Sequence, residues 1–322
     1  MRLLIPVKRV LLSIAILIAC SSGLADSGAG SNQATKLIEE AAEKIQEQSY
    51  YAGRVDWPSA IEEAKGEVAN GASPEDARQA IDGMLRKLHD RHSFLLRPER
   101  LNAVFENKAT DDIHIATRDL GDVFLVTVPA FVGTQAERER AYAEKLHAAL
   151  SGLKPRCGWI VDLRNNEGGN MFAMLAGLAP LLGTEGLGSF AYRSKQAEWE
   201  TRGIFERTGL QPETVESPDL RTAPVAVLTS GRTMSSGEAV VIAFRGRPRT
   251  RSFGASTAGK TSGNRGVKLS DGSMLLLATA LMADRAGTVY ERPIQPDEPT
   301  GTSDEAILPP ALGWLRSTCE AH

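Results

Sequence analysis

Two adjacent serines, Ser235 and Ser236, stand in the stretch GRTMSSGEAVVIAF (residues 231–244) and could carry out acyl transfer. The apolar run after them predicts a helix, whose first backbone N–H groups are unpaired and whose dipole favours a developing oxyanion. In the functional hypothesis, Ser235 attacks a carbonyl carbon and the N–H of Ser236 holds the negative oxygen. A structural role is also open, because Ser235 and Glu238 form the S-x-x-E pattern of a capping box. The hypothesis therefore requires a base and a second oxyanion donor elsewhere.

A second candidate is GASTAGKT, Gly254 to Thr261, which matches the phosphate-binding loop pattern G-x-x-x-x-G-K-[ST]. Such a loop requires a buried strand before it and a helix after it, and neither RPRTRSF before it nor SGNRG after it fits. The basic pair and apolar run at the N-terminus also predict export, and an exported protein rarely meets ATP, so the sequence argues against nucleotide binding. Lys260 is then either a solvated loop lysine or a catalytic one.

The third candidate is DLRNNEGGN, Asp162 to Asn170, which follows the apolar stretch GWIV. As a structural element, it is a polar turn between a strand and a helix, with glycines where φ is positive. As a functional element, Gly168 and Gly169 present backbone N–H groups at a helix start, and such pairs bind oxyanions or peptide backbone. Each of the three candidates is weak when it is taken alone.

Alternating strand and helix patterns predict an α/β core at about 112–300, preceded by a helical segment. The expected helices and strands lie, in chain order, at 37–45, 57–68, 73–88, 123–131, 134–150, 158–163, 171–182, 225–228 and 235–244. Ser73 is a candidate N-cap before Pro74. The stretch VKLSDGSMLLLAT predicts a hairpin with Asp271-Gly272 at its turn. Residues 183–222 are polar and loosely patterned, which is typical of a lid or an insertion.

The composition is that of an ordinary globular protein, with 322 residues, 42% hydrophobic residues and a formal net charge of −3. A charge this small provides no basic footprint for nucleic acid and no polybasic membrane patch. At the N-terminus, Lys8 and Arg9 precede the apolar run Val10 to Ala19, which is the pattern of a secretory signal peptide. Two processing routes fit: cleavage after GLA at residues 23–25, or lipidation of Cys20, because LIAC resembles the bacterial lipoprotein box.

Cys157 and Cys319 remain in the mature domain, where they either pair in an oxidising compartment or stay as two buried thiols. His89 and His92 lie three residues apart, but no further ligand set with metal spacing follows them. The sequence therefore predicts neither a metal site nor an organic cofactor.

The three candidates occur together in an order that is known from one enzyme family. With WIVDLRNNEGG, TMSSGEAVVIAF, FGASTAGK and LSDGSMLLLAT…PIQPDEP, the chain resembles the tail-specific (C-terminal processing) serine peptidases and their tricorn-like relatives over roughly residues 85–300. The resemblance implies a crotonase- or Clp-protease-like spiral α/β core. The roles that it implies are a nucleophile, Ser235; a partner base, Lys260; a residue that orients the lysine, Asn264; and an oxyanion hole made by Gly168 or Gly169 with Ser236.

Two features depart from the processing-peptidase pattern. Only about 18 residues separate Ser93 from Asp112, which leaves no room for the PDZ domain that those enzymes usually carry there. The stretch LHDRHSF, residues 88–94, instead resembles the tricorn-like branch, in which a histidine here is the general base and an acidic residue after the hairpin is its companion. In this chain, His92 and Glu291 match those two positions.

The chain therefore carries two candidate bases. A lysine must be neutral to act as a base, which requires burial to lower a pKa that starts near about 10.4, whereas a histidine starts near about 6.5. The sequence favours His92 as the base, with Glu291 orienting it and Lys260 in support, and the reverse assignment stays open. Each residue also has a purely structural alternative. His92 would be a helix-end histidine with a local hydrogen bond, and Glu291 would be an exposed carboxylate at a strand edge.

These inferences predict an exported serine endopeptidase, periplasmic or lipid-anchored, that binds a protein or peptide along Gly168-Gly169 and cleaves it through an acyl-enzyme. The alternative is a non-catalytic peptide- or ligand-binding member of the same fold, in which Ser235 is only a cap. No nucleic-acid partner is expected, and lipid on Cys20, in the second processing route, would be the one membrane contact. The expected boundaries are a signal peptide at 1–25, a flexible leader at 26–33, a helical subdomain at 34–110, a peptidase core at 111–305 and a C-terminal segment at 306–322.

Overall fold

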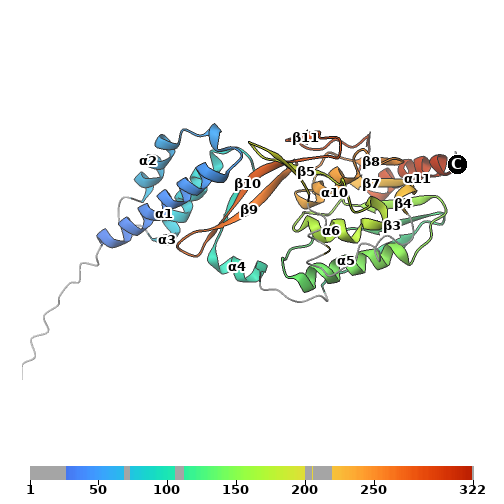
Figure 1. Cartoon of the computed structure of the whole chain (residues 1–322), viewed down its shortest axis with the longest axis horizontal. Helices are drawn as coiled ribbons and strands as arrows, with labels where there is room; N and C mark the ends of the chain where they lie inside the picture. The colour runs from blue at the N-terminus through green and yellow to red at the C-terminus, as the bar shows by residue number, and fades with distance from the viewer. Residues whose placement is uncertain (1–26, 69–72, 106–111, 200–204, 206–219, 321–322) are drawn as a thin grey trace, which may run out of the picture.

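A six-stranded, mostly parallel sheet forms the centre of the computed structural model, which describes residues 27–68, 73–105, 112–199, 205 and 220–320 (Figure 1). The strand order is β12-β8-β7-β4-β3-β2, and only β2 and β3 pair in the antiparallel sense. The strands are β2 Thr117–Asp119, β3 Val123–Thr127, β4 Gly158–Asp162, β7 Val225–Thr229, β8 Thr250–Gly254 and β12 Glu298–Pro299. Every residue of β4 and β7 is buried, because helices cover both faces of the sheet, and such strands are continuous apolar runs. The predicted α/β core is therefore confirmed.

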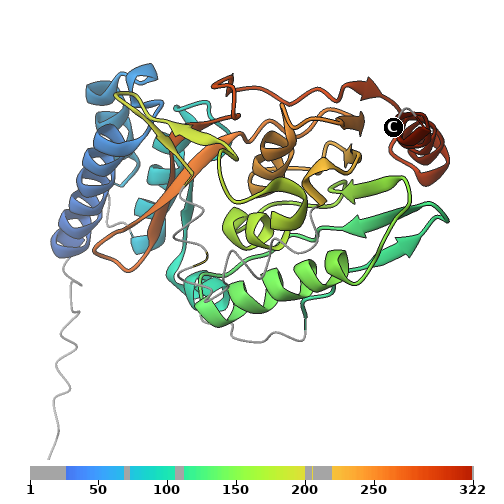
Figure 2. The same cartoon turned by 45° about the vertical axis from the view of Figure 1, so that its right-hand side comes forward.

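The covering helices lie on opposite faces of the sheet. One face packs against α5, α6 and α10, and the other face packs against α11 (Figure 2). These helices are α5 Ala136–Ser151, α6 Met171–Gly177, α7 Ala179–Leu182, α10 Ser236–Phe244 and α11 Asp304–Glu320. The single helix expected at 171–182 is broken at Leu178, because Pro180 has no N–H with which to continue α6 and occupies the first turn of α7 instead.

A disulfide bond ties α11 to the sheet. Cys157 directly precedes β4 and Cys319 lies in the last turn of α11, with their Cα atoms 5.0 Å apart. Of the two states that the sequence left open, the structure has the paired one. The bond closes a long loop and therefore restricts the unfolded chain.

A second sheet joins this core to the N-terminal helices. Its strands are β1 Phe94–Leu96, β5 Ser189–Ala191, β6 Gln196–Glu198, β9 Ser262–Lys268, β10 Met274–Ala283 and β11 Val289–Tyr290. The long strand β10 pairs with β9 and β11 along one edge and with β1 and β5 along the other. β9 and β10 are the predicted hairpin, and Gly272 at its turn has a φ of 85°. Because β1, β5 and β9 all pair with β10, residues near positions 92, 190 and 262 lie close to one another.

Three helices, α1 Ser27–Gln48, α2 Trp57–Glu67 and α3 Pro74–Arg86, pack on one another and on β10 at one end of the molecule (Figure 1). Ser73 caps α3 as predicted, because its hydroxyl accepts a hydrogen bond from the Asp76 N–H. α1 includes residues 27–33, for which the sequence predicted a flexible leader. The correction has a simple reason: once the buried face of α1 has nucleated a helix, adding further residues at its end costs little.

The remaining described elements are the 3-10 turns Ala52–Arg54 and Leu220–Thr222 and the helix α4 Pro98–Phe105. The expected signal peptide, with Cys20, lies outside the described residues. In the part of the chain that the structure covers, no helix has both the length and the apolar character that crossing a membrane requires.

Candidate active site

Ser235 lies between β7 and α10, one residue before the helix begins. Its backbone has φ 53° and ψ −117°, a conformation that residues with a side chain rarely adopt and that is found where a fold holds a residue for function. The Glu238 carboxylate accepts a hydrogen bond from the Ser235 N–H at 3.0 Å, which is one arm of the expected capping box. The Ser235 hydroxyl lies 3.1 Å from Nε2 of His92. Ser235 therefore begins the helix and also presents its hydroxyl to a base.

A strained turn between α3 and β1 presents His92. His89 and Arg91 both have positive φ, at 52° and 58°. Asp90, between them, accepts hydrogen bonds from the N–H groups of His92 at 3.0 Å and Ser93 at 2.9 Å. These bonds stabilise a backbone shape that costs free energy on its own, so the turn holds the His92 ring in one place.

The second ring nitrogen of His92 contacts Ser262, the first residue of β9. Nδ1 lies 2.6 Å from the Ser262 hydroxyl, although the two residues are 170 positions apart in the chain. When Nδ1 carries the ring proton and donates it to Ser262, Nε2 is left to accept the proton of Ser235. β10 causes this meeting, because β1 and β9 pair with opposite edges of the same strand.

Burial and the nearby Lys260 ammonium lower the pKa of His92 to about 4, and Asp90 acts in the opposite direction. His92 is 8% exposed, so its charged form is poorly solvated. The imidazole is therefore neutral at neutral pH and is competent to accept a proton. Of the two candidate bases, His92 is the one whose side chain is hydrogen-bonded to Ser235 among the described residues.

This pKa predicts the pH dependence of the site. Because only neutral His92 can take the proton of Ser235, we expect kcat/KM to hold well below pH 6.5 and to fall with a midpoint near pH 4. Between these two values the unfolded state binds the proton and the folded state does not, so the free energy of unfolding also decreases as the pH is lowered through this window. A pH–rate profile on a peptide substrate, with circular dichroism to monitor folding, measures both effects.

The variant Lys260→Met provides the matched comparison for this profile. Removing the ammonium relieves a repulsion that opposes protonation of His92, so the acid limb should move to higher pH. A wild-type acid limb near pH 6.5, or a limb that does not move in Lys260→Met, contradicts the assignment.

Two backbone N–H groups beside Ser235 can hold an oxyanion. Within the described residues, neither the N–H of Gly169 nor that of Ser236 has a hydrogen-bond partner. The Ser236 hydroxyl donates to the Gly169 carbonyl at 2.7 Å, which holds the two residues together. The Gly168 N–H is already bound by the Asn166 side chain at 2.9 Å. Of the two glycines that the sequence offered, the geometry therefore favours Gly169 as the donor.

Both glycines are required by the space around them. Gly168 has a φ of 97°, and a Cβ there would lie 2.8 Å from the Cβ of Ser235. Gly169 has a φ of 118°, and a Cβ there would lie 1.9 Å from the Phe131 carbonyl oxygen. A side chain at either position is therefore excluded by contact and by backbone conformation, so the paired glycines allow the backbone to approach Ser235 closely.

Glu238 joins the Ser235 turn to the loop before β9. This fully buried carboxylate accepts hydrogen bonds from the N–H groups of Gly259 and Lys260, both at 2.8 Å, and from the Thr257 hydroxyl, besides the Ser235 N–H. Burial raises the pKa of Glu238, and these four hydrogen bonds act against that rise. The carboxylate thus fixes the backbone of Lys260 and of Ser235 in one arrangement.

The same contacts correct the analysis of the phosphate-loop pattern. The strand β8, which was not expected here, ends at Gly254, but the strand β9 follows the loop instead of the required helix. The N–H groups of Gly259 and Lys260, which such a loop would offer to a phosphate, are bound to Glu238. The loop therefore serves the serine site.

Replacing Glu238 tests this arrangement. In Glu238→Gln, the one carbonyl oxygen keeps two of the four donors and the NH₂ group must face the other two, so we expect a loss of about 2 kcal/mol or more in unfolding free energy. We also expect at least about tenfold slower modification of Ser235 by a fluorophosphonate, because the serine turn loses its position. Urea unfolding and labelling kinetics measure the two effects. Glu298→Gln, in a half-exposed ion pair with Arg251, is the control and should change neither by more than a small amount.

Two expected contacts are not found. Glu291 was expected to orient His92, but its carboxylate is exposed and forms an ion pair with Arg54 at 2.6 Å; Ser262 contacts Nδ1 instead. Glu291 follows β11, which the pairing with β10 directs toward the helical end of the molecule. Asn264 was expected to orient Lys260, but its side-chain amide donates to the backbone carbonyl of His92 at 2.8 Å. It therefore holds the His92 turn.

The partners that hold the site together were not predicted from the motifs. Asn166 donates to the Val128 carbonyl at 3.0 Å, and its backbone carbonyl accepts from the Met234 N–H, so it binds the Gly168 turn to the serine turn. Glu238 was considered only as a cap. Its position in a helix that is otherwise apolar all round was a usable signal, because a buried charge requires buried partners. No local signal indicates Ser262.

A cleft of about 520 Å³ opens at Ser235. Its lining residues are Thr134, Glu139, Gly169, Asn170, Met171, Phe172, Phe190, Ser235, Ser236, Ser262, Gly263, Asn264 and Met282. Aromatic and methionine side chains form one part of the cleft wall. Ser235 and the N–H groups of Gly169 and Ser236 form another part. A concave, partly apolar site with a few convergent polar groups suits a peptide.

An α/β fold that brings a strained serine, a buried histidine and unpaired N–H groups to one cleft has the geometry of a serine hydrolase. The chain belongs to peptidase family S41, whose sequence model matches residues 122–300. It is 28% identical over 286 residues to the nisin-resistance protein of Lactococcus lactis subsp. lactis, across 88% of this chain and 87% of that protein.

Solved structures agree with this membership. A lipoprotein from Streptococcus agalactiae superposes with a TM-score of 0.76 at 26% identity, over 88% of this chain and 96% of that one. The photosystem II D1 C-terminal processing protease superposes with a TM-score of 0.54 at 17% identity, over 84% of this chain and 94% of that one, which is a likeness of fold. The predicted Clp-protease-like fold and the resemblance to this peptidase family are confirmed.

Proposed function

We propose that this protein is an exported serine endopeptidase that cleaves peptides through an acyl-enzyme on Ser235. The contact between the Ser235 hydroxyl and Nε2 of His92, at 3.1 Å, carries the proposal. A hydroxyl that merely capped α10 would not need a strained backbone or a buried imidazole beside it. Membership of a peptidase family supports the reaction class.

In the proposed mechanism, Nε2 of His92 takes the Ser235 proton as Oγ attacks the scissile carbonyl carbon. The N–H groups of Gly169 and Ser236 hold the oxygen that becomes negative. The imidazolium then gives its proton to the leaving amine, and water releases the acyl group by the same steps. Ser262 accepts the hydrogen bond of Nδ1–H throughout. Because its hydroxyl carries no negative charge, it orients the ring without lowering the cost of the imidazolium as a carboxylate would.

The N-terminal pattern and the relatives support export. The first residues carry a basic pair, an apolar run and small residues. A similar solved structure is that of a lipoprotein, and the curated relative is named for resistance to nisin. We infer that the chain acts in the cell envelope, either released after cleavage or held by lipid on Cys20, and that nisin is a reasonable first test substrate.

Mass spectrometry of cleavage products tests the proposed function. The purified protein is incubated with a peptide library and, separately, with nisin, and new peptide termini are identified. The control is Ser235→Ala protein prepared in the same way. Cleavages present only with the unsubstituted protein support the proposal, and identical products from both proteins refute it.

A further inference from the structure

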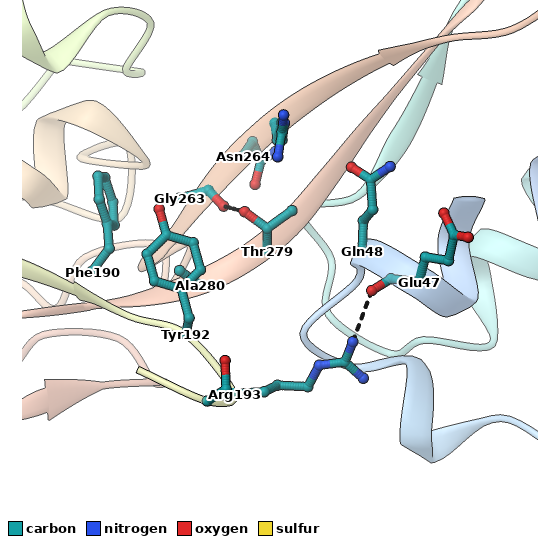
Figure 3. A pocket seen from close by; sticks show the side chains of 11 residues that line it. Glu47, Gln48, Phe190, Tyr192, Arg193, Gly263, Asn264, Thr279 and Ala280 are labelled. Carbon is teal, nitrogen blue, oxygen red and sulfur yellow. Dashed lines mark hydrogen bonds between the residues drawn. The ribbon is translucent and has the colours of Figure 1, made fainter. Parts of the chain in front are cut away.

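A second pocket, of about 490 Å³, adjoins the Ser235 cleft and has no part in the mechanism above. The two hollows share three wall residues, Phe190, Gly263 and Asn264. The other walls of this pocket come from the end of α1, the β5–β6 hairpin and β9–β10 (Figure 3). A peptide that lies in the cleft can therefore continue into this pocket over the Gly263 backbone.

Two guanidinium groups border the second pocket without a carboxylate partner. Arg193 donates to the backbone carbonyl of Glu47 at 2.9 Å, as Figure 3 shows, and Arg265 is exposed on β9. Within the described residues, neither arginine forms an ion pair. Among the described residues of the lining, the one acidic side chain, Glu47, lies 3.7 Å from Lys44. The pocket therefore has an excess of positive charge, and both guanidinium groups keep N–H donors that no described carboxylate occupies.

Gln48 provides an independent observation. Its Oε1 atom is buried and has no hydrogen-bond partner among the described residues. Figure 3 shows the side chains of Gln48, Asn264 and Thr279 around the same space. A buried acceptor without a donor costs free energy, and a turn of the Gln48 amide toward the pocket would let a backbone N–H of a bound peptide satisfy it.

We propose that this pocket is a substrate subsite that binds a carboxylate of the peptide, remote from the scissile bond, through Arg193 and Arg265. Gln48 accepts a backbone N–H of the same peptide. The subsite rests on the proposed function, because its occupant is the peptide that lies across Ser235. Asn264 connects the two places: it lines the pocket and its amide donates to the His92 carbonyl at 2.8 Å. Peptides with a carboxylate in this subsite are therefore the preferred substrate class.

Peptide binding to Ser235→Ala protein tests the subsite without cleavage. Fluorescence anisotropy compares decapeptide pairs that differ only by Asp or Asn at one position, scanned along the peptide, and a further pair that differs only by a free or amidated C-terminus. We expect about tenfold tighter binding of the acid form in one such pair, with the preference weakened by salt. An effect in an Asp/Asn pair assigns the carboxylate to a side chain, and an effect in the terminal pair assigns it to the C-terminus.

Arginine variants on the same background locate the preference. Arg193→Ala with Arg265→Ala should abolish the acid preference, and Arg265→Glu should replace it by a preference for lysine at that position. Arg316→Ala removes an arginine of α11 at the other end of the molecule and should keep the preference (Figure 1). Persistence of the preference in the double variant overturns the subsite.

The remaining outcomes separate this proposal from the proposed function. Equal binding of acid and amide forms overturns the subsite, and so does the absence of peptide binding. Acid preference without cleavage by the unsubstituted protein supports the subsite and contradicts the peptidase proposal. Cleavage by the unsubstituted protein without a preference for the acid form supports the peptidase proposal and overturns the subsite.

Discussion

Ser235→Ala should abolish covalent labelling by a fluorophosphonate and lower kcat for peptide hydrolysis about a million-fold, because it removes the hydroxyl that contacts Nε2 of His92 beside the N–H groups of Gly169 and Ser236. The Ser235 hydroxyl contacts Nε2 of His92, whereas the neighbouring Ser236 hydroxyl donates to the Gly169 carbonyl. Gel fluorescence after probe treatment and steady-state kinetics on a cleaved peptide measure the two losses.

The neighbouring serine is the matched control. Ser236→Ala removes the contact with the Gly169 carbonyl but keeps the backbone N–H of residue 236, so labelling should persist with a loss of no more than about tenfold. If Ser235→Ala protein is labelled as well as the unsubstituted protein, a residue other than Ser235 is the reactive nucleophile. If neither protein is labelled, Ser235 is only a helix cap and the chain is a non-catalytic binding member of its family.

His92→Ala should lower kcat by about ten-thousand-fold or more, and Lys260→Ala by less than about tenfold. The structure places His92 in contact with both Ser235 and Ser262, while Lys260 acts on His92 through its charge. Single-turnover kinetics with a chromogenic peptide ester compare the variants, because acylation depends directly on the base.

The opposite ranking of these two variants would assign the proton transfer to Lys260 and reduce His92 to a packing role. Thermal unfolding of both variants distinguishes a chemical effect from misfolding. His92 is a buried neutral ring, and alanine there leaves a cavity whose cost is independent of the reaction. A His92→Ala protein that melts like the parent but has lost its rate supports the base assignment.

The elements of the core could be predicted because their signals are local. β4 and β7 are apolar runs that end in one polar residue each, Asp162 and Thr229, and the turn Asp271-Gly272 defines the β9–β10 hairpin. The predictions that were wrong concern the ends and interruptions of elements. Residues 27–33 extend α1, and the chain breaks between α6 and α7 at a proline-containing turn. The residue at which an element ends depends on propensity differences of about a few tenths of a kcal/mol, and tertiary packing overrides differences of that size.

The sequence by itself determined the α/β class and the candidate serine and glycine pair, because the motifs around Ser235 and Gly168-Gly169 are contiguous stretches whose chemistry can be interpreted residue by residue. Only the tertiary structure decided what surrounds them: Ser262 and not Glu291 beside His92, Asn264 on the His92 carbonyl, and Glu238 between the serine turn and the lysine loop. The physical reason is strand pairing. Residues 170 positions apart meet because β1 and β9 bind opposite edges of β10, and no local periodicity encodes that register.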